Sequence, residues 1–129
     1  MTGVQTCALP ISVVGFESAL LLHQLSDILP EKTHLIVPSS FRKKPPANVV
    51  LHKAKLLLNE ISTQQGVQVT TPLRTLLDLA KTPISPEHFN QAVQEALQKG
   101  MVRQQKLVEA AQTLPSKAQQ RLVKAIKTL

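Results

Sequence analysis

Thr71 to Leu79 reads TPLRTLLDL and carries the strongest helix signal in the chain. Thr71 is a suitable N-cap, because its hydroxyl can accept a hydrogen bond from the first turn. Pro72 follows at the first helical position, where the N–H that proline lacks would have no partner within the helix. Apolar side chains then recur at helical spacing and form one face: Leu73, Leu76, Leu77 and Ala80. We therefore predict a helix that begins at Pro72 and packs on a core through its leucines.

Arg74 conflicts with the local rules for this helix. It falls in the first turn, where the helix dipole favours acidic side chains. One explanation is an ion pair with Asp78, one turn further along the helix. The other explanation is an acidic partner outside the domain. Both remain open from the sequence, so Arg74 is a candidate partner contact, and Thr71 and Asp78 are candidate structural residues.

Four short segments have the composition of β-strands: residues 33–37, 49–52, 61–63 and 67–69. In the last of them Val67 and Val69 alternate with polar residues, as expected for a strand with one buried face. The third and fourth segments are separated by Gln64, Gln65 and Gly66, which predicts a β-hairpin that turns there.

Helical patterns occupy the rest of the chain. Residues 15–30 contain an apolar helix that Pro30 closes, and a helix capped by Ser85 begins at Pro86 and ends at Gly100. A short helix follows over residues 104–113, and Ser116 is expected to cap a last helix. The fold class is therefore α+β. We expect a small, mostly antiparallel sheet of three to four short strands, with an N-terminal helix and a C-terminal set of about four helices.

Composition limits the class of protein. The chain has 129 residues, three Phe, no Tyr and no Trp, so its core has to be built from Leu, Val, Ile and Ala. It contains no run of roughly 18 apolar residues that would cross a membrane. Its single cysteine, Cys7, excludes an internal disulfide. These features predict one soluble, cytoplasmic domain.

The positive charge is concentrated in two blocks. The net charge is +7, and residues 30–55 carry six basic side chains against one acidic, while residues 99–129 carry seven against one. Such blocks suit a polyanion or an acidic protein partner, although a solvated surface that keeps the protein soluble explains them equally well. The candidate contacts are the loop residues Arg42, Lys43 and Lys44, the strand residue Lys53, and the last-helix residues Lys117, Arg121 and Lys124.

No catalytic motif is present. The chain has no glycine-rich phosphate loop and no nucleophile elbow, and its acidic residues do not cluster in the sequence. His34 and His52 lie on neighbouring predicted strands and can meet, but the sequence offers no clear third metal ligand. His23 is expected to be a hydrogen-bonded core residue. We therefore predict no enzyme activity, no metal and no cofactor.

The first eleven residues, MTGVQTCALPI, resemble translated sequencing adapter of the kind found at the ends of metagenomic reading frames. We leave residues 1–12 out of the fold prediction as a non-native or disordered leader. The alternative is a native N-terminus without regular structure. The expected domain covers residues 13–129.

Several blocks together resemble one known family. They are ESALLLHQLSDILP at 17–30, HLIVP at 34–38, VVLHKAK at 49–55 and GVQVTTPLRTLLDLA at 66–80. This combination is similar to the AbiEi family of antitoxins and transcriptional regulators from type IV toxin–antitoxin systems. The resemblance extends from Gly15 to Ala80, and the remaining helices match in layout only.

The resemblance implies an antitoxin that counteracts a nucleotidyltransferase-like toxin without necessarily forming a stable complex with it. It also implies that operator DNA is read mainly by a winged helix-turn-helix module, which we expect to be missing before Val13. Two other functions stay open. One is the leader domain of a nuclease-like enzyme that continues beyond Leu129, and the other is a generic basic nucleic-acid-binding domain, whose affinity would fall steeply with salt.

Overall fold

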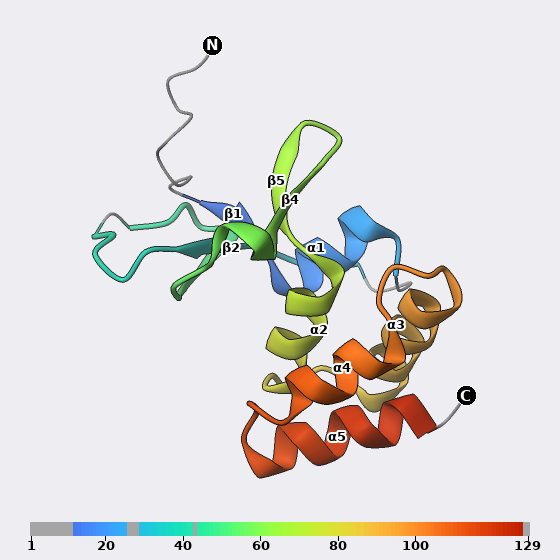
Figure 1. The fold of residues 1–129 in the computed structure, drawn as a ribbon. Coiled ribbons are helices and arrows are strands. Elements are labelled where there is room, and N and C mark those ends of the chain that lie inside the picture. The colour runs from blue at the N-terminus through green and yellow to red at the C-terminus, as the bar shows by residue number, and fades with distance from the viewer. Residues whose placement is uncertain (1–11, 26–28, 43, 128–129) are drawn as a thin grey trace.

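The computed structural model describes residues 12–25, 29–42 and 44–127. A five-stranded sheet occupies one end of the molecule and the last three helices occupy the other, with α1 and α2 between them (Figure 1). The elements in chain order are β1 (Val13–Val14), α1 (Phe16–His23), β2 (Thr33–Val37), β3 (Val49–Lys53), the short 3-10 helix η2 (Leu58–Glu60), β4 (Ile61–Gln64), β5 (Val67–Thr70), α2 (Pro72–Ala80), α3 (Pro86–Gln98), α4 (Gln104–Ala111) and α5 (Ser116–Lys127).

The sheet is mixed, with strand order β3-β2-β1-β5-β4. β1 pairs antiparallel with β2 and parallel with β5, while β2 and β3 are parallel and β4 and β5 are antiparallel. The α+β class, the N-terminal helix and the four later helices confirm the prediction. The sheet differs in detail, because it has five strands and only half of its pairings are antiparallel. The strand β1 has two residues, too few for any periodic pattern, yet it lies at the centre of the sheet.

The predicted hairpin is confirmed in β4 and β5. Gln64 pairs with Val67, so the turn consists of Gln65 and Gly66 alone. Both turn residues have positive φ angles, 53° and 77°, as two-residue hairpin turns of type I′ require. The hairpin projects away from the rest of the molecule (Figure 1).

The passage from β1 into α1 depends on a close backbone approach at Gly15. The Gly15 N–H donates to the carbonyl of His34 at 3.1 Å, and a Cβ at Gly15 would lie 2.6 Å from Cδ1 of Ile36. The helix that follows is shorter than the predicted segment 15–30. It ends at His23 because Gln24 adopts the left-handed conformation and its N–H caps the last turn.

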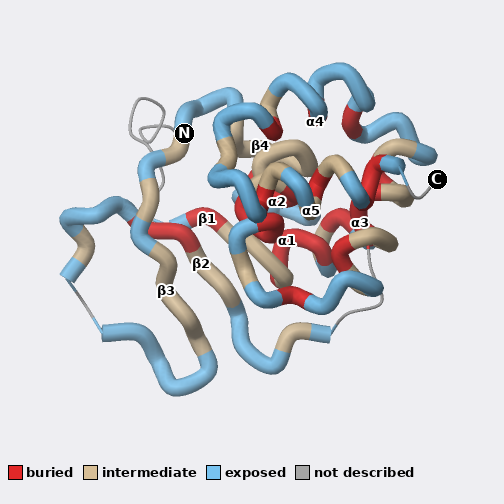
Figure 2. Tube along the Cα trace, turned by 90° about the horizontal axis from the view of Figure 1, so that it is seen from below, coloured by how far each residue is buried: buried red, intermediate tan, exposed pale blue. Residues whose placement is uncertain are grey.

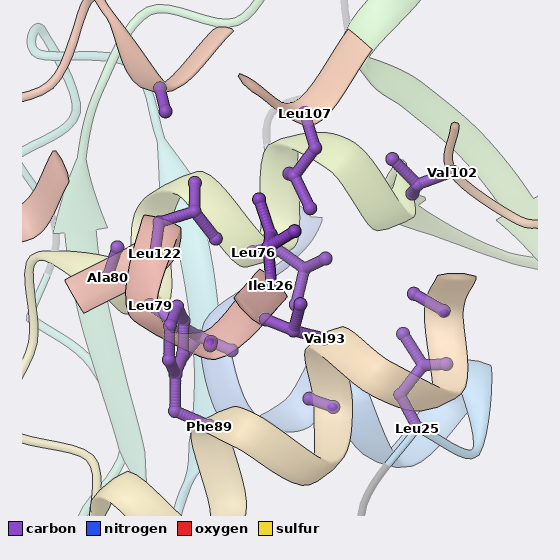
Figure 3. Close-up of a cluster of buried hydrophobic side chains, with 14 of the residues drawn as sticks. Leu25, Leu76, Leu79, Ala80, Phe89, Val93, Val102, Leu107, Leu122 and Ile126 are labelled. Atoms are coloured by element: carbon purple, nitrogen blue, oxygen red, sulfur yellow. The ribbon is translucent and has the colours of Figure 1, made fainter. Parts of the chain in front are cut away.

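The helices enclose an apolar core in which the largest side chains are fully buried (Figure 3). Buried residues concentrate in the helices, above all α1, α2, α3 and α5, and in the inner strands, whereas the loop after β2 is mostly exposed (Figure 2). α3 buries Phe89, Ala92, Val93 and Ala96, and α4 buries Leu107 and Ala111. The fully buried core residues from the helices include Leu20, Leu76, Leu79, Phe89, Val93, Leu107 and Leu122.

Two of the three predicted helix caps form. The Thr71 hydroxyl accepts from the N–H of Arg74 at 3.4 Å, and the Ser85 hydroxyl accepts from the N–H of His88 at 3.3 Å. Ser116 is instead the first residue of α5, and the carbonyl of Pro115 accepts the N–H of Gln119. The boundary is one residue earlier than expected, as is usual for helix ends.

Candidate functional site

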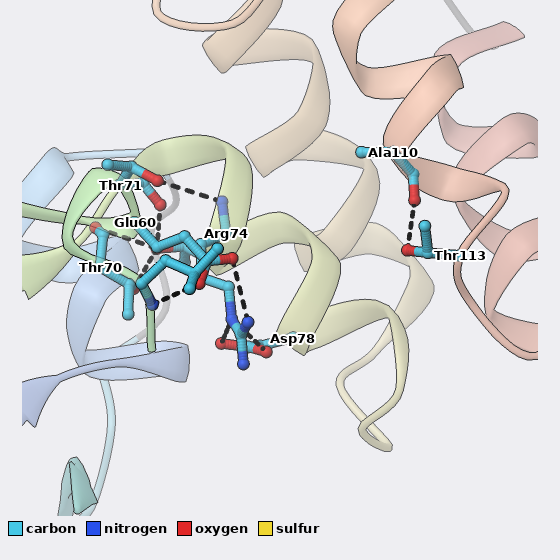
Figure 4. A network of polar contacts seen from close by, with 9 residues as sticks. Glu60, Thr70, Thr71, Arg74, Asp78, Ala110 and Thr113 are labelled. Atoms are coloured by element: carbon cyan, nitrogen blue, oxygen red, sulfur yellow. Dashed lines mark hydrogen bonds and ion pairs between the residues drawn. The ribbon is translucent and has the colours of Figure 1, made fainter. Parts of the chain in front are cut away.

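Arg74 lies between two carboxylates that belong to different elements. Its Nε is 3.0 Å from Oδ1 of Asp78 on the same helix, and its Nη1 is 3.1 Å from Oε2 of Glu60 at the end of η2 (Figure 4). The predicted pair with Asp78 is confirmed, and Glu60 is an additional partner that helical spacing could not indicate. The cluster ties the start of α2 to the segment that enters β4.

The Arg74 cluster is only partly accessible to solvent. The side chain of Asp78 is 4% exposed and that of Arg74 is 19% exposed. Burial raises the pKa of the Asp78 carboxyl above its ordinary value, and the Arg74 guanidinium opposes part of that shift. Two carboxylates on one guanidinium satisfy its charge inside the domain, which is the arrangement of a structural ion-pair network.

A second polar network lies behind the first turn of α2. Thr75 Oγ1 donates to the carbonyl of Thr71 at 2.8 Å and lies 2.6 Å from Thr70 Oγ1. The ring of His23 approaches the carbonyl of Thr70 with Nε2 at 2.8 Å, so this nitrogen carries the proton and donates. The prediction that His23 is a hydrogen-bonded core residue is confirmed. These contacts fix α1, β5 and α2 against one another.

The basic residues near the sheet are exposed. Arg42 and Lys44 lie in the loop after β2, and Lys53 is at the end of β3. The guanidinium of Arg42 donates through Nη1 to the carbonyl of Ser39 at 3.1 Å, which holds the loop in a turn. Lys43 lies outside the described residues. The exposed cations of this loop are placed where an acidic partner can reach them.

The basic residues of α5 have different surroundings. Lys117 and Lys124 are exposed, but Arg121 is half-buried. The guanidinium of Arg121 donates to the carbonyls of Thr82 and Ile84 and lies 4.9 Å from the ring centroid of Phe89. Arg121 therefore fixes the connection between α2 and α3, a role its helical position did not suggest. The loop after β2 and α5 lie at different ends of the molecule, so the structure does not merge the two basic blocks (Figure 1).

His34 and His52 meet on the sheet as predicted. Nδ1 of His34 and Nε2 of His52 are 2.9 Å apart, and the ring of Phe16 stacks on His52 with centroids 3.9 Å apart. Burial lowers the pKa of His52, and the nearby charge of His34 lowers it further. Within the described part of the chain, no third His, Cys, Asp or Glu joins the pair to form a metal-binding group.

Residues 12–127 match the family model of the AbiEi antitoxin C-terminal domain. The chain belongs to this family. Members of this family are not known as enzymes. Membership implies an antitoxin role and a cognate toxin. No curated protein matches the chain. In the described ranges of this AbiEi domain, every helix is too short or too polar to cross a membrane.

Sequence reasoning missed several residues of these clusters. Glu60 and Thr75 belong to the polar networks around α2 but were not candidates, and Arg121 was a candidate for a contact outside the domain. In the AbiEi domain these side chains hold neighbouring elements together. The exposed residues Arg42, Lys44, Lys53, Lys117 and Lys124 are left as the candidate contacts for a partner.

Proposed function

We propose that this AbiEi domain counteracts a nucleotidyltransferase-like toxin of a type IV toxin–antitoxin system in the cytoplasm. The observation that carries the proposal is the family match over residues 12–127, which spans both the sheet and the helices. Operator reading, which the family resemblance assigns to a winged helix-turn-helix, is not part of the proposal for this domain.

The exposed cations are the proposed contact residues. Arg42, Lys44 and Lys53 lie beside the sheet, and Lys117 and Lys124 lie on α5. Arg74 and Arg121 are weaker candidates, because both side chains are only partly exposed, whereas the other five residues are exposed. A surface that opposes a toxin by occupying an acidic molecule needs cations whose charge is available to solvent.

The test is growth rescue. Residues 12–129 are co-expressed with the nucleotidyltransferase-like toxin encoded beside the antitoxin gene, and growth is compared with that of cells expressing the toxin alone. We expect the domain to restore growth, and we expect charge reversal of Arg42 and Lys44, or of Lys117 and Lys124, to reduce the rescue. Reversal of Arg103 and Lys106 is the matched control, because both are exposed but lie at the start of α4 and not in the loop after β2 or on α5.

The proposal fails if a domain shown by circular dichroism to be folded does not restore growth. A second function, generic binding of nucleic acid, is favoured by the same exposed lysines. It predicts affinity for duplex DNA without sequence preference, and log affinity should fall linearly with log salt concentration. If rescue survives charge reversal of both pairs, Arg42 with Lys44 and Lys117 with Lys124, the antitoxin activity depends on another part of the domain.

A further inference from the structure

A cavity of about 190 Å³ opens beside the start of β1, where the chain passes from β3 to β4. β3 and β4 are the two outer strands of the sheet, so the connecting residues 54–60 have to cross the sheet from one edge to the other. Val13, Ile36 and Val37 line the cavity from the strands, and Leu56 lines it from the crossing segment. The walls are therefore mainly apolar.

The crossing segment leaves further apolar surface beside the cavity. The next two residues of the chain after Leu56 are exposed, Leu57 by 58% and Leu58 by 73%. Large exposed apolar groups next to an apolar hollow are typical of surfaces that bind another molecule. No described element covers these two leucines.

The crossing segment is also held in place. Glu60 accepts the N–H of Leu57 through Oε1 at 2.8 Å, and its Oε2 pairs with Arg74 at 3.1 Å. The carbonyl of Glu60 accepts the N–H of Thr71 at 3.0 Å. The cavity is thus preformed, and a ligand would not have to order this segment when it binds.

The size of the cavity selects the kind of group that fits. Sites for drug-sized molecules usually have about 300–1,000 Å³, so this cavity is too small for a whole ligand of that class. An apolar cavity of about 150 Å³ accepts benzene, which makes the space suitable for one large side chain. The occupant is therefore expected to be a single anchor such as Phe or Leu.

The basic residues at the rim of the cavity determine which residues of a bound segment are favoured next to the anchor. Lys55 lines the cavity and is exposed, and Lys53 is exposed two residues earlier. Arg42 is bonded to the carbonyl of Ser39, a further lining residue. The described lining residues include no acid, and Glu60 is neutralised by Arg74. Acidic residues on either side of the anchor would complement this rim.

We propose that this cavity is the docking site for an acidic protein segment that inserts one large apolar side chain. The anchor enters between Leu56 and the strand residues. Leu57 and Leu58 cover its flanks, and Lys53 and Lys55 meet the acids beside it. The site lies away from α5 and shares Lys53 with the contact residues proposed beside the sheet. Peptide binding is measured without the toxin, so its failure is distinguishable from a failure of growth rescue.

The test uses the whole chain and a fluorescein-labelled peptide with one central Phe between two pairs of Asp or Glu. We expect saturable binding, with amide chemical shifts in NMR that change at Val13, Ile36, Ser39 and Lys55. Replacing the Phe by Ser should weaken binding about tenfold or more, because the buried apolar group is lost. Replacing the acids by Lys should abolish binding.

Variants of the protein sharpen the result. Ala54→Leu fills the cavity and Lys55→Glu reverses its rim, and each should weaken peptide binding severalfold, while Lys106→Glu on α4 should not. No saturable binding below about 1 mM overturns the proposal. It is also overturned if the Ser peptide binds as well as the Phe peptide, or if duplex DNA, and not the peptide, perturbs these amides.

Discussion

The imidazole of His52 stacks on the ring of Phe16 and contacts that of His34, and its environment lowers its pKa below the ordinary 6.5, mainly through burial. The unfolded chain therefore binds this proton more readily than the folded protein does. Stability from the neutral imidazole is fully present above the unfolded pKa and is lost as the pH falls below it. We expect the free energy of unfolding, measured by urea denaturation, to decrease from about pH 7.5 to about pH 5.5.

One variant assigns this slope to its source. His52→Gln should flatten the decrease, because it removes the ionisable ring whose pKa is lowered. The series stops above the acidic range because Asp78 acts in the opposite direction there. Its pKa is raised by burial from the ordinary 3.8, so its contribution falls as the pH rises through that range. A slope that His52→Gln leaves unchanged would contradict the assignment.

At the scale of the element, α2 is buried on two sides. Leu76 and Leu79 pack into the helical core, while Thr75 and Asp78 are buried against the polar groups near β5 and η2. The sequence pattern placed Leu77 on the inner face, but it is only half-buried. A single hydrophobic stripe could not reveal the second buried face, because that face is polar.

Two identical substitutions on α2 test this orientation. Leu76→Ala should lower the free energy of unfolding by about 2–5 kcal/mol, since it empties a fully buried site. Leu77→Ala removes the same atoms from a half-buried site and should cost clearly less. Urea denaturation of both variants gives the comparison. Equal losses, or a larger loss for Leu77→Ala, would show that the helix is rotated about its axis.

Local signals explain which elements could be predicted from the sequence. The caps Thr71 and Ser85, the apolar period of α3 and the Gln65–Gly66 turn each act over a few residues, and the structure contains all of them. The central strand β1 could not be predicted, because Val14 pairs with Leu35 and Val69, both far along the chain. The internal role of Arg121 was missed for the same reason, since its acceptors lie 39 and 37 residues away.

At the scale of the whole molecule, the apolar core belongs mainly to the helices. The large cluster joins α1, α2, α3, α4 and α5, while the buried strand residues Val13, Ile36, Val37 and Val69 lie outside it. Polar contacts link the sheet and η2 to the helices, among them those of His23 with Thr70 and of Arg74 with Glu60. Its outer strand β3 has no buried residue, whereas five of the nine residues of α2 are buried.

Native-state hydrogen exchange in low concentrations of urea should therefore separate the two ends of the molecule. Amides of α2 and α3 can exchange only when the helical core opens, so their exchange free energy should equal that of global unfolding and fall steeply with urea. Amides of β3 can exchange when the outer strand detaches, an event that exposes little surface and depends weakly on urea. Arg74→Ala should lower the protection of β4 and β5 more than that of α3, because it cuts the link between η2 and α2. Equal protection and equal urea dependence in β3 and α2 would mean that the sheet and the helices unfold as one unit.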